Sequence, residues 1–297
     1  MPPSTPPRAL RRVGIQGILK PLFVERAGGS VTLTVTFSVG VDLPADRKGS
    51  DLSRHAEVLA EVVDRTANHP VPSLEAASSE IVRELLLRHP YAMESEVRAV
   101  APYFLRKGIS PERTSYEDYR LFAEATAVRG AGADPIRLTR WIGAEAVGMT
   151  ACPCAMETAR EALQAEFPAL ADPALAPMPV VTHNQRNVTR LAFELAPGVE
   201  VEADEMIASI ESAQSSPTFA ILKRGDEARA VIEAHRHPKF VEDVLRDLLA
   251  LVPTRFAQLP DGAAVRVESR SEESIHKYDV FASHEATLAE LRGSATG

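Results

Sequence analysis

Alternating apolar and polar residues predict a pair of strands near the start of the chain. Between residues 31 and 41, threonines at every second position alternate with leucine, valine and phenylalanine, which is the period of a half-buried strand. Residues 13–25 also read as extended, and residues 26–30 between the two runs hold two glycines of the kind found in hairpin turns. The pattern therefore predicts an antiparallel hairpin.

Further along, the apolar spacing changes to that of amphipathic helices. One helix is predicted after residue 50, with Ser50 or Asp51 as its N-cap and apolar residues on one face. A second helix fits residues 74–88 and a third fits residues 203–213. The clearest amphipathic pattern covers residues 238–252, where apolar side chains recur on one side.

Short runs of apolar and β-branched residues predict the remaining strands. They cover residues 96–105, 136–147, 188–195, 218–222 and 264–269. Two readings remain for residues 107–134. The segment is either a connector that is helical over residues 116–128, or a hairpin whose turn the pattern does not locate.

Each half of the chain reads as a strand pair, a helix pair and then one or two more strands. Hairpins with helices between them predict an antiparallel sheet covered by helices on one face, which is an α+β arrangement. We divide the chain into a disordered arm at residues 1–10, a first half at 11–134 and a second half at 135–290. Packing against another subunit is one way to bury the other face of the sheet.

Composition and charge narrow the functional classes. The chain has 297 residues, of which 45% are hydrophobic and 25% charged, values typical of a globular protein with a core. Its net charge of −8 argues against a general nucleic-acid or anionic-membrane binder, so a phosphorylated ligand requires a local basic cluster. No apolar run in the sequence is long enough to span a bilayer. The only two cysteines lie too close together to staple the fold, which favours a reducing cytoplasm.

Those two cysteines, Cys152 and Cys154, flank a proline between a predicted strand and a predicted helix at residues 155–167. The proline fixes its own φ angle and restricts the residue before it, so the turn that presents the thiols is stiff. A sulfur beside a helix N-terminus is favoured as an anionic metal ligand or nucleophile. The alternative is that both cysteines are simply small side chains in a tight turn.

Four further polar clusters stand out, at residues 182–186, 222–227, 238–243 and 272–277. A thiolate, an imidazole and a carboxylate can form an open catalytic site for a divalent metal, and Cys154, His183 and Glu227 can supply one each. Spacing alone does not establish this, because the three are far apart and the chain holds eight histidines. For Glu242 and Glu273, the alternative is a solvated face of a helix or strand.

Taken together, these clusters resemble GTP cyclohydrolase I of the type IB family, which is prokaryotic and metal-dependent. The resemblance covers most of the chain and rests on six motifs in order: residues 41–49, the Cys-Pro-Cys turn, and residues 183–186, 222–227, 238–243 and 273–276. Residues 148–150 and the long insert between Cys154 and His183 are closer to the archaeal-type subgroup. That subgroup is reported to form a dihydroneopterin cyclic phosphate, whereas bacterial folate-pathway members form the triphosphate.

The resemblance implies a tunnelling fold with two units fused in one chain, assembled as a homotetramer with active sites at subunit interfaces. GTP and water would be the substrates in an early step of pterin or folate-type cofactor synthesis. One divalent metal per subunit would be bound by Cys154, His183 and Glu227, with Cys152 close by and assisting. Ferrous iron is the metal expected for the archaeal type, with zinc or manganese as alternatives.

The same resemblance assigns roles to other residues. Glu242 would anchor guanine, since one carboxylate can accept hydrogen bonds from both N1–H and the exocyclic amine. His276 and Glu273 would manage protons, with His276 protonating the purine nitrogen and Glu273 orienting it. Basic residues in or near the motifs would hold the phosphates, namely Arg47, Lys48, Arg54, Arg186, Lys223 and Arg224.

Two other functions remain open from the sequence. One is a different tunnelling-fold enzyme that acts on another purine or a pterin and shares only the base-anchoring glutamate. The other is a binding protein without catalytic activity, in which the metal is structural. A closed four-ligand metal site would favour the binding protein, and formate release from GTP would exclude it.

Overall fold

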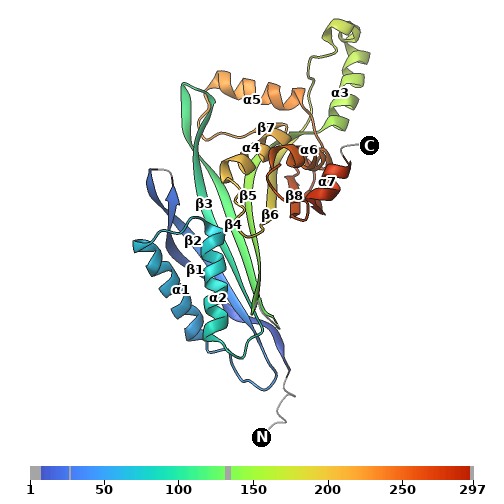
Figure 1. Cartoon of the computed structure of the whole chain (residues 1–297). Coiled ribbons are helices and arrows are strands. Elements are labelled where there is room, and N and C mark those ends of the chain that lie inside the picture. The colour runs from blue at the N-terminus through green and yellow to red at the C-terminus, as the bar shows by residue number, and fades with distance from the viewer. Residues whose placement is uncertain (1–7, 27, 131–134, 295–297) are drawn as a thin grey trace. The chain divides into compact units, whose positions relative to one another are not determined.

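A computed structural model describes residues 8–26, 28–130 and 135–294 (Figure 1). The strands are β1 (Leu10–Arg26), β2 (Gly29–Leu43), β3 (Glu94–Ser110), β4 (Arg113–Arg129), β5 (Ile136–Ala151), β6 (Asn184–Glu194), β7 (Ser216–Pro217), β8 (Ala264–Glu272) and β9 (Val280–Thr287). The α-helices are α1 (Leu52–Asn68), α2 (Leu74–Arg88), α3 (Pro153–Glu166), α4 (Ala203–Ala213), α5 (Arg224–Arg236), α6 (Val241–Arg255) and α7 (Leu288–Ser294). Two short 3-10 turns, Pro168–Ala171 and Pro173–Leu175, follow α3.

The order of these elements repeats along the chain. A strand pair, a helix pair and a second strand pair appear first as β1, β2, α1, α2, β3 and β4. The same order returns as β5, β6, α4, α6, β8 and β9, with α3, β7 and α5 inserted. This doubled order of antiparallel strands and helices confirms the predicted α+β class.

The chain packs as two compact units that interleave in sequence. One unit holds the residues up to 103 with 120–142 and 194–197, and the other holds 104–119, 143–193 and the residues from 198 onward. Strands β3, β4 and β5 each contribute residues to both units. The division into repeats at 11–134 and 135–290 stays a prediction, and the predicted arm lies mostly in residues 1–7, outside the described residues.

In the first unit, α1 packs on the β1–β2 hairpin and on α2. The strand pairing is antiparallel, with Leu22 opposite Leu33 and Ile18 opposite Phe37. Alternate residues of β2 are buried, as the threonine pattern predicts. They form a core with the apolar faces of the two helices, so the period of the sequence determines which side of the hairpin is covered.

In the second unit, β6, β8 and β9 are consecutive antiparallel strands, and α4 and α6 are packed against each other. Helix α6 also packs on β8 and β9. The rings of Phe193 on β6 and Phe256 after α6 lie 4.6 Å apart and are fully buried. At the other end of α6, the backbone N–H of Lys239 donates to the carbonyl oxygen of Ala151 at 3.0 Å, which holds the start of the helix beside the end of β5.

The structure corrects the helical reading of residues 116–128. That segment belongs to β4, which forms a hairpin with β3 through the turn at Pro111 and Glu112. Residues 119, 121, 123, 125 and 127 are buried in alternation, which is the period of a strand. Three of those five are alanines, which favour a helix by intrinsic propensity, so pairing with neighbouring strands outweighs the local preference.

Three further elements differ from the expectation. The strand predicted at residues 218–222 is wrong, because the pairing with β5 is made by Ser216 and Pro217. Helix α5 was not predicted, since few of its residues are buried and its apolar Val231 and Ile232 are exposed. Strand β9 was missed for a similar reason: Phe281 is 72% exposed, so no apolar alternation marks the strand.

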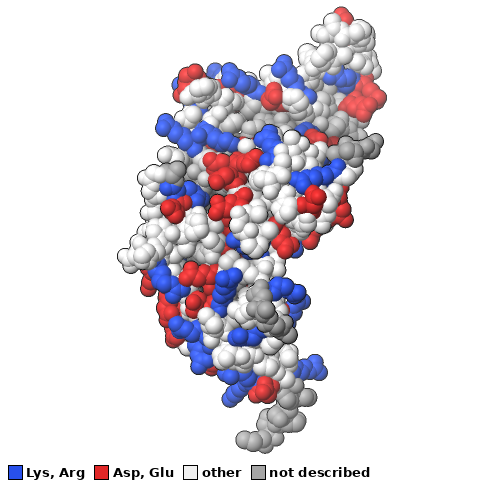
Figure 2. Space-filling view, viewed as in Figure 1, with Lys and Arg blue, Asp and Glu red and all other residues white. Residues whose placement is uncertain are grey.

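Charged side chains of both signs are interspersed on the face of the molecule seen in Figure 2. Among the described residues, no helix is both long and apolar enough to cross a bilayer.

Candidate active site

The Cys-Pro-Cys turn joins the end of β5 to the start of α3. Cys152 is the N-cap residue of the helix, and its sulfur accepts a hydrogen bond from the backbone N–H of Ala155 at 3.5 Å. Pro153 occupies the first helical turn, where its missing N–H costs no hydrogen bond. The strand, turn and helix therefore follow one another as predicted. Cys152 is half-buried, while Cys154 is exposed.

Two hydrogen bonds hold this turn to the segment that carries His183. The backbone N–H of Cys152 donates to the carbonyl oxygen of His183 at 3.0 Å. In the reverse direction, the hydroxyl of Thr182 donates to the carbonyl oxygen of Cys152 at 2.8 Å. The imidazole is thereby placed beside the half-buried thiol, although the long insert separates them in sequence.

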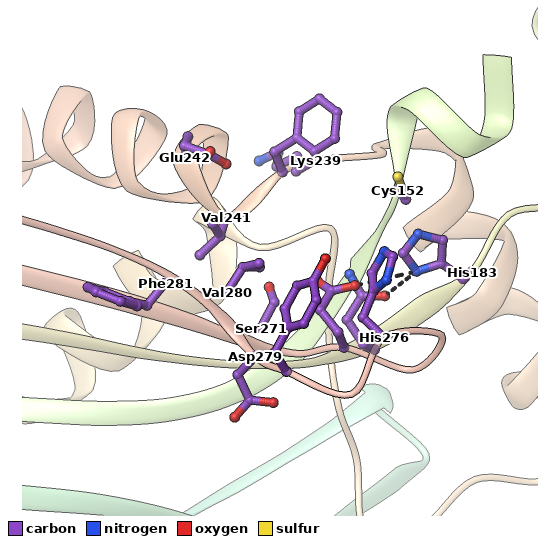
Figure 3. Close-up of a pocket in the computed structure, with 14 residues that line it drawn as sticks. Cys152, His183, Lys239, Val241, Glu242, Ser271, His276, Asp279, Val280 and Phe281 are labelled. Carbon is purple, nitrogen blue, oxygen red and sulfur yellow. Dashed lines mark hydrogen bonds and ion pairs between the residues drawn. The ribbon is translucent and has the colours of Figure 1, made fainter. Parts of the chain in front are cut away.

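A cavity of about 510 Å³ opens next to Cys152 and His183 (Figure 3). Residues from the turn, β6, β8, β9 and the start of α6 line it: Cys152, His183, Gln185, Lys239, Phe240, Val241, Glu242, Ser271, Glu273, His276, Tyr278, Asp279, Val280 and Phe281. Cys152, His183 and His276 lie on one side of the cavity and Glu242 on the other (Figure 3). The volume lies within the range typical of small-molecule sites.

Three titratable side chains meet on the His183 side. His183 Nδ1 lies 3.7 Å from Glu273 Oε2, and the side chains of His183 and Glu273 are only 12% and 8% exposed. The ring of His276 stands perpendicular to that of His183, with 6.4 Å between centroids. Tyr278 stacks on His276 at 5.0 Å and 9°. The imidazole of His276, although exposed, is therefore held between a second imidazole and a phenol.

Glu242 lies in the first turn of α6, with its side chain exposed. The helix is capped by Asp243, whose carboxylate accepts from the backbone N–H of Phe240 at 3.0 Å. Glu242 therefore does not cap the helix, and its side chain lines the cavity. Lys239, next to it, is ion-paired with Asp247 at 2.7 Å and donates to the carbonyl oxygen of Ala213.

The predicted metal ligands are only partly brought together. His183 lines the cavity, but Cys154 and Glu227 are exposed and do not line it, so one chain does not assemble the predicted trio. The thiol that faces the cavity is Cys152. Among the described residues, no three or more histidine, cysteine, aspartate or glutamate side chains are grouped as a metal site.

Glu227 is directed elsewhere by the contacts that hold α5. Asp226, its neighbour, accepts from the backbone N–H of Lys223 and pairs with Arg113 on β4. The Lys223 N–H, together with the Arg113 guanidinium, holds the pKa of Asp226 below its usual value. These contacts tie the start of α5 to the β3–β4 hairpin and leave Glu227 on the exposed side.

The predicted phosphate-binding residues also lie outside the cavity lining. Arg186, Lys223 and Arg224 are exposed, and none of them lines the cavity. Arg47 belongs to the first unit, where its guanidinium lies over the ring of Tyr91 at 3.9 Å, and Lys48 beside it is exposed.

Several lining residues were not predicted from the sequence, among them Gln185, Lys239 and Tyr278. Gln185 and Lys239 lie inside recognised polar clusters, so the clusters located them without assigning a role. Tyr278 follows His276 by two positions in a segment without regular pattern, and no signal in the sequence marks it.

The family of the chain follows from its match to a family model. The family model described as type I GTP cyclohydrolase folE2 matches residues 3–282 of the chain. The chain belongs to this family.

Curated relatives named as GTP cyclohydrolases align with nearly the whole length of this chain. A protein named GTP cyclohydrolase MptA from Methanococcoides burtonii is 40% identical over 294 residues, covering 96% of this chain and 92% of its own. The protein of the same name from Methanosarcina mazei is 40% identical over 293 residues, with 95% and 92% covered. The Methanothermobacter thermautotrophicus protein is 36% identical, with 98% and 92% covered.

Solved structures with little sequence similarity show the fold. Uricase from Arthrobacter globiformis superposes with a TM-score of 0.51 at 9% identity and covers 93% of each chain. A uricase from Bacillus fastidious gives a TM-score of 0.54 at 10% identity, with 97% of each chain covered. The predicted tunnelling fold, an antiparallel sheet with helix pairs, is thereby confirmed.

The type I GTP cyclohydrolase family is metal-dependent, and the cavity lining contains the kinds of donor atom that bind a divalent ion. Cys152, His183 and Glu273 offer sulfur, nitrogen and oxygen donors on the same side. Donors of these three kinds suit first-row divalent metals. The donor types therefore suit such an ion, while the described side chains are not grouped as a metal site and the predicted ligand set stays a prediction.

Proposed function

We propose that this chain is a GTP cyclohydrolase that opens the imidazole ring of guanine by hydrolysis and releases C8 as formate. The observation that carries the proposal is the single cavity on which Cys152, His183, Glu242, Glu273 and His276 converge. A chain of this family that gathers a thiol, two imidazoles and two carboxylates around one hollow has the groups that purine hydrolysis requires.

Glu242 recognises the base in this proposal. Its carboxylate can accept two hydrogen bonds at once, from N1–H and from the exocyclic amine of guanine. Adenine lacks this pair of donors and would leave the carboxylate unpaired in the closed site. The position of Glu242 across the cavity from His183 separates base recognition from the chemistry at C8 (Figure 3).

His276 and Glu273 handle the protons. As water adds to C8, the ring nitrogen gains electron density, and His276 donates a proton to that nitrogen. Glu273 is nearly enclosed and lies 3.7 Å from Nδ1 of His183, so it orients that imidazole rather than exchanging freely with solvent. Tyr278 holds the His276 ring from its other face.

A divalent ion, which we propose to be ferrous iron with zinc or manganese as alternatives, supplies hydroxide near neutral pH when it is bound. The predicted ligand His183 lines the cavity, and Cys152 is the thiol that lines it with His183. The proposed carboxylate ligand is the predicted Glu227, because Glu273 lies beside Nδ1 of His183 and has a separate role. The Glu227→Ala and Cys154→Ala variants test the predicted ligands. Loss of bound metal in either variant would show that the replaced residue is a ligand.

The phosphates of GTP call for cations that one chain does not place in the cavity. Glu242, Glu273 and Asp279 line the cavity, while its one lysine, Lys239, is already paired with Asp247. We therefore propose a homo-oligomer, a tetramer as in the predicted assembly, in which a second copy contributes basic residues. The candidates are Arg47, Lys48, Arg186, Lys223 and Arg224.

Subunit mixing tests this part of the proposal. At a GTP concentration well below the KM of the variants, an Arg47→Ala, Lys48→Ala double variant and a Glu242→Ala variant should each show little activity alone. Mixed after dissociation and reassembly, they should regain activity, because some sites then combine an intact base pocket with intact cations. Failure to regain any activity in verified mixed oligomers would contradict a shared site.

The product is proposed to be the 2′,3′-cyclic phosphate of dihydroneopterin, in an early step of pterin synthesis. A hydroxyl of the dihydroneopterin side chain would close this ring by attacking the α-phosphorus, and pyrophosphate would leave. Both cysteines are free thiols, and a thiol ligand needs a reducing compartment, so we place the enzyme in the cytoplasm.

The test of the function is formate release by anaerobic, iron-loaded protein supplied with GTP. Formate should appear with GTP and not with ATP, should disappear when the metal is chelated, and should return with Fe(II). Turnover of a different purine or a pterin would favour another tunnelling-fold enzyme. Tight metal binding without any turnover would favour a binding protein.

A further inference from the structure

Gln185 joins His183 to a buried group of neutral polar side chains. His183 Nδ1 lies 2.9 Å from Gln185 Oε1, and the Gln185 amide nitrogen donates to Thr150 Oγ1 at 3.1 Å. Gln185 is 9% exposed and Thr150 is fully buried. The glutamine side chain is therefore enclosed and held at both ends.

A backbone carbonyl, which can only accept, determines which atoms donate and which accept in the hydrogen bonds beneath Gln185. Gln214 Nε2 donates to the carbonyl oxygen of Asn187 at 2.9 Å and to Asn187 Oδ1 at 3.0 Å. Oδ1 is thus the accepting end of this amide, and its nitrogen donates to Ser271 Oγ at 3.1 Å. Thr150 Oγ1 lies 3.4 Å from Ser271 Oγ and can donate to it while accepting from Gln185.

The bond to Gln185 determines which nitrogen of the His183 imidazole carries the hydrogen. An amide oxygen cannot donate, so Gln185 Oε1 requires a hydrogen on Nδ1 of His183. The Glu273 carboxylate, 3.7 Å from the same nitrogen, favours the same arrangement. The other tautomer would set a nitrogen lone pair against an anionic oxygen. Both neighbours therefore leave Nε2 as the nitrogen that carries the free electron pair.

We propose that Gln185 is a positioning residue that selects the Nδ1–H tautomer of His183 and presents Nε2 as an electron-pair donor. The use of Nε2 as a metal ligand rests on the proposed function, whereas the tautomer itself does not. Partners that fix the second nitrogen of a ligating histidine typically change metal affinity by about 10- to 100-fold when they are removed.

The tautomer is tested by nitrogen NMR of the full-length chain labelled in its histidine rings, metal-free and well above the unperturbed histidine pKa of about 6.5. His183→Ala assigns the signal. The wild type should carry hydrogen on Nδ1, and Gln185→Leu should show a mixture of both tautomers. A wild-type imidazole with hydrogen on Nε2, or a Gln185→Leu variant without change, would overturn the proposal.

Metal affinity, measured by competition between zinc-loaded protein and a chelator, gives the second readout. Gln185→Leu should bind zinc about 10- to 100-fold more weakly. Gln185→Glu should remain within a few-fold of wild type, because a carboxylate still accepts from Nδ1–H. Equal losses in the two variants would contradict a tautomer effect.

Two controls separate this inference from folding and from the proposed function. Gln164→Leu removes an amide that donates to the carbonyl oxygen of Leu170 beside α3, and it should leave zinc affinity unchanged. Thermal unfolding of each variant checks that the fold is retained. A wild type with the expected tautomer but no affinity for zinc would uphold the role of Gln185 and count against the proposed metal at His183.

Discussion

Cys152 donates its backbone N–H to the carbonyl oxygen of His183, at 3.0 Å. Together with the Thr182 hydroxyl, which donates to the carbonyl oxygen of Cys152 at 2.8 Å, this bond closes a small ring of backbone between two distant segments. The backbones of Cys152 and His183 are thus held side by side by two hydrogen bonds, which brings the thiol and the imidazole to the same cavity.

Removing the Thr182 hydroxyl should loosen this ring. We expect Thr182→Val to lower metal affinity by about tenfold, because the valine methyl cannot donate to the Cys152 carbonyl and the turn loses one of its two ties. Competition with a chelator measures the effect. Thr218→Val is the matched control, since it removes a similar bond from a threonine to the carbonyl oxygen of Val147. Equal affinity in all three proteins would argue against a role for the tie.

Replacing His276 should separate chemistry from metal binding. We expect His276→Ala to keep its metal and its KM for GTP, while kcat for formate release falls by about 10²- to 10⁴-fold through loss of the proton donor. His284→Ala, an exposed histidine on β9, should behave as wild type. Normal turnover by His276→Ala would remove it from the proton-transfer role.

Glu242 should determine the affinity for the base. We expect Glu242→Ala to reduce kcat/KM by about a hundredfold or more, mainly through KM, since hydrogen bonds to a charged group are each worth about 1.5–3 kcal/mol. Metal content should not change. Glu233→Ala, which removes an exposed carboxylate on α5, serves as control. An unchanged KM in Glu242→Ala would place guanine recognition elsewhere.

The first unit carries a titratable group whose effect should be visible in stability. His55 is fully buried beside His89, at 4.4 Å between ring centroids, and burial, with a further contribution from His89, lowers the pKa of His55. The unfolded chain therefore takes up this proton first as the pH falls. The contribution of His55 to stability is complete above about pH 6.5 and is lost progressively below it.

We accordingly expect the free energy of unfolding to fall on acidification below about pH 6.5, and His55→Leu to reduce that slope by up to about 1.4 kcal/mol per pH unit. Denaturant unfolding at a series of pH values measures it. His69→Leu, at the exposed end of α1, is the control and should keep the wild-type slope. If the free energy of unfolding changes with pH by the same slope in His55→Leu and in the wild type, His55 is not the source of the pH dependence.

Much of the fold follows from local pattern, and the exceptions have physical reasons. The hairpin at the start, helices α2 and α4, and the strand–turn–helix around the cysteines match the apolar periods of their sequences. For strand β4 the sequence leaves a partly helical connector and a hairpin both open, because alanines occupy half of its buried positions and their small side chains hide the period of two. Long-range pairing, which no local window contains, decides such a segment.

The site shows a similar limit. The motifs located His183, Glu242, Glu273 and His276, all of which line one cavity. Which cysteine faces that cavity depends on the helix phase after Pro153, and the sequence does not state that phase. The direction of Glu227 depends on α5, whose first turn is held by the pair between Arg113 and Asp226. Just before the helix, the backbone N–H of Ala220 donates to Glu117. Contacts between residues this distant in sequence are not visible in a motif.

Hydrolysis of GTP labelled at C8 tests the central claim most directly. If the chain opens the guanine ring as proposed, anaerobic iron-loaded protein should release one labelled formate for each GTP consumed. Mass spectrometry should then find an unlabelled dihydroneopterin 2′,3′-cyclic phosphate. Label that stays in the nucleotide while GTP is consumed, or GTP that remains intact, would contradict the account.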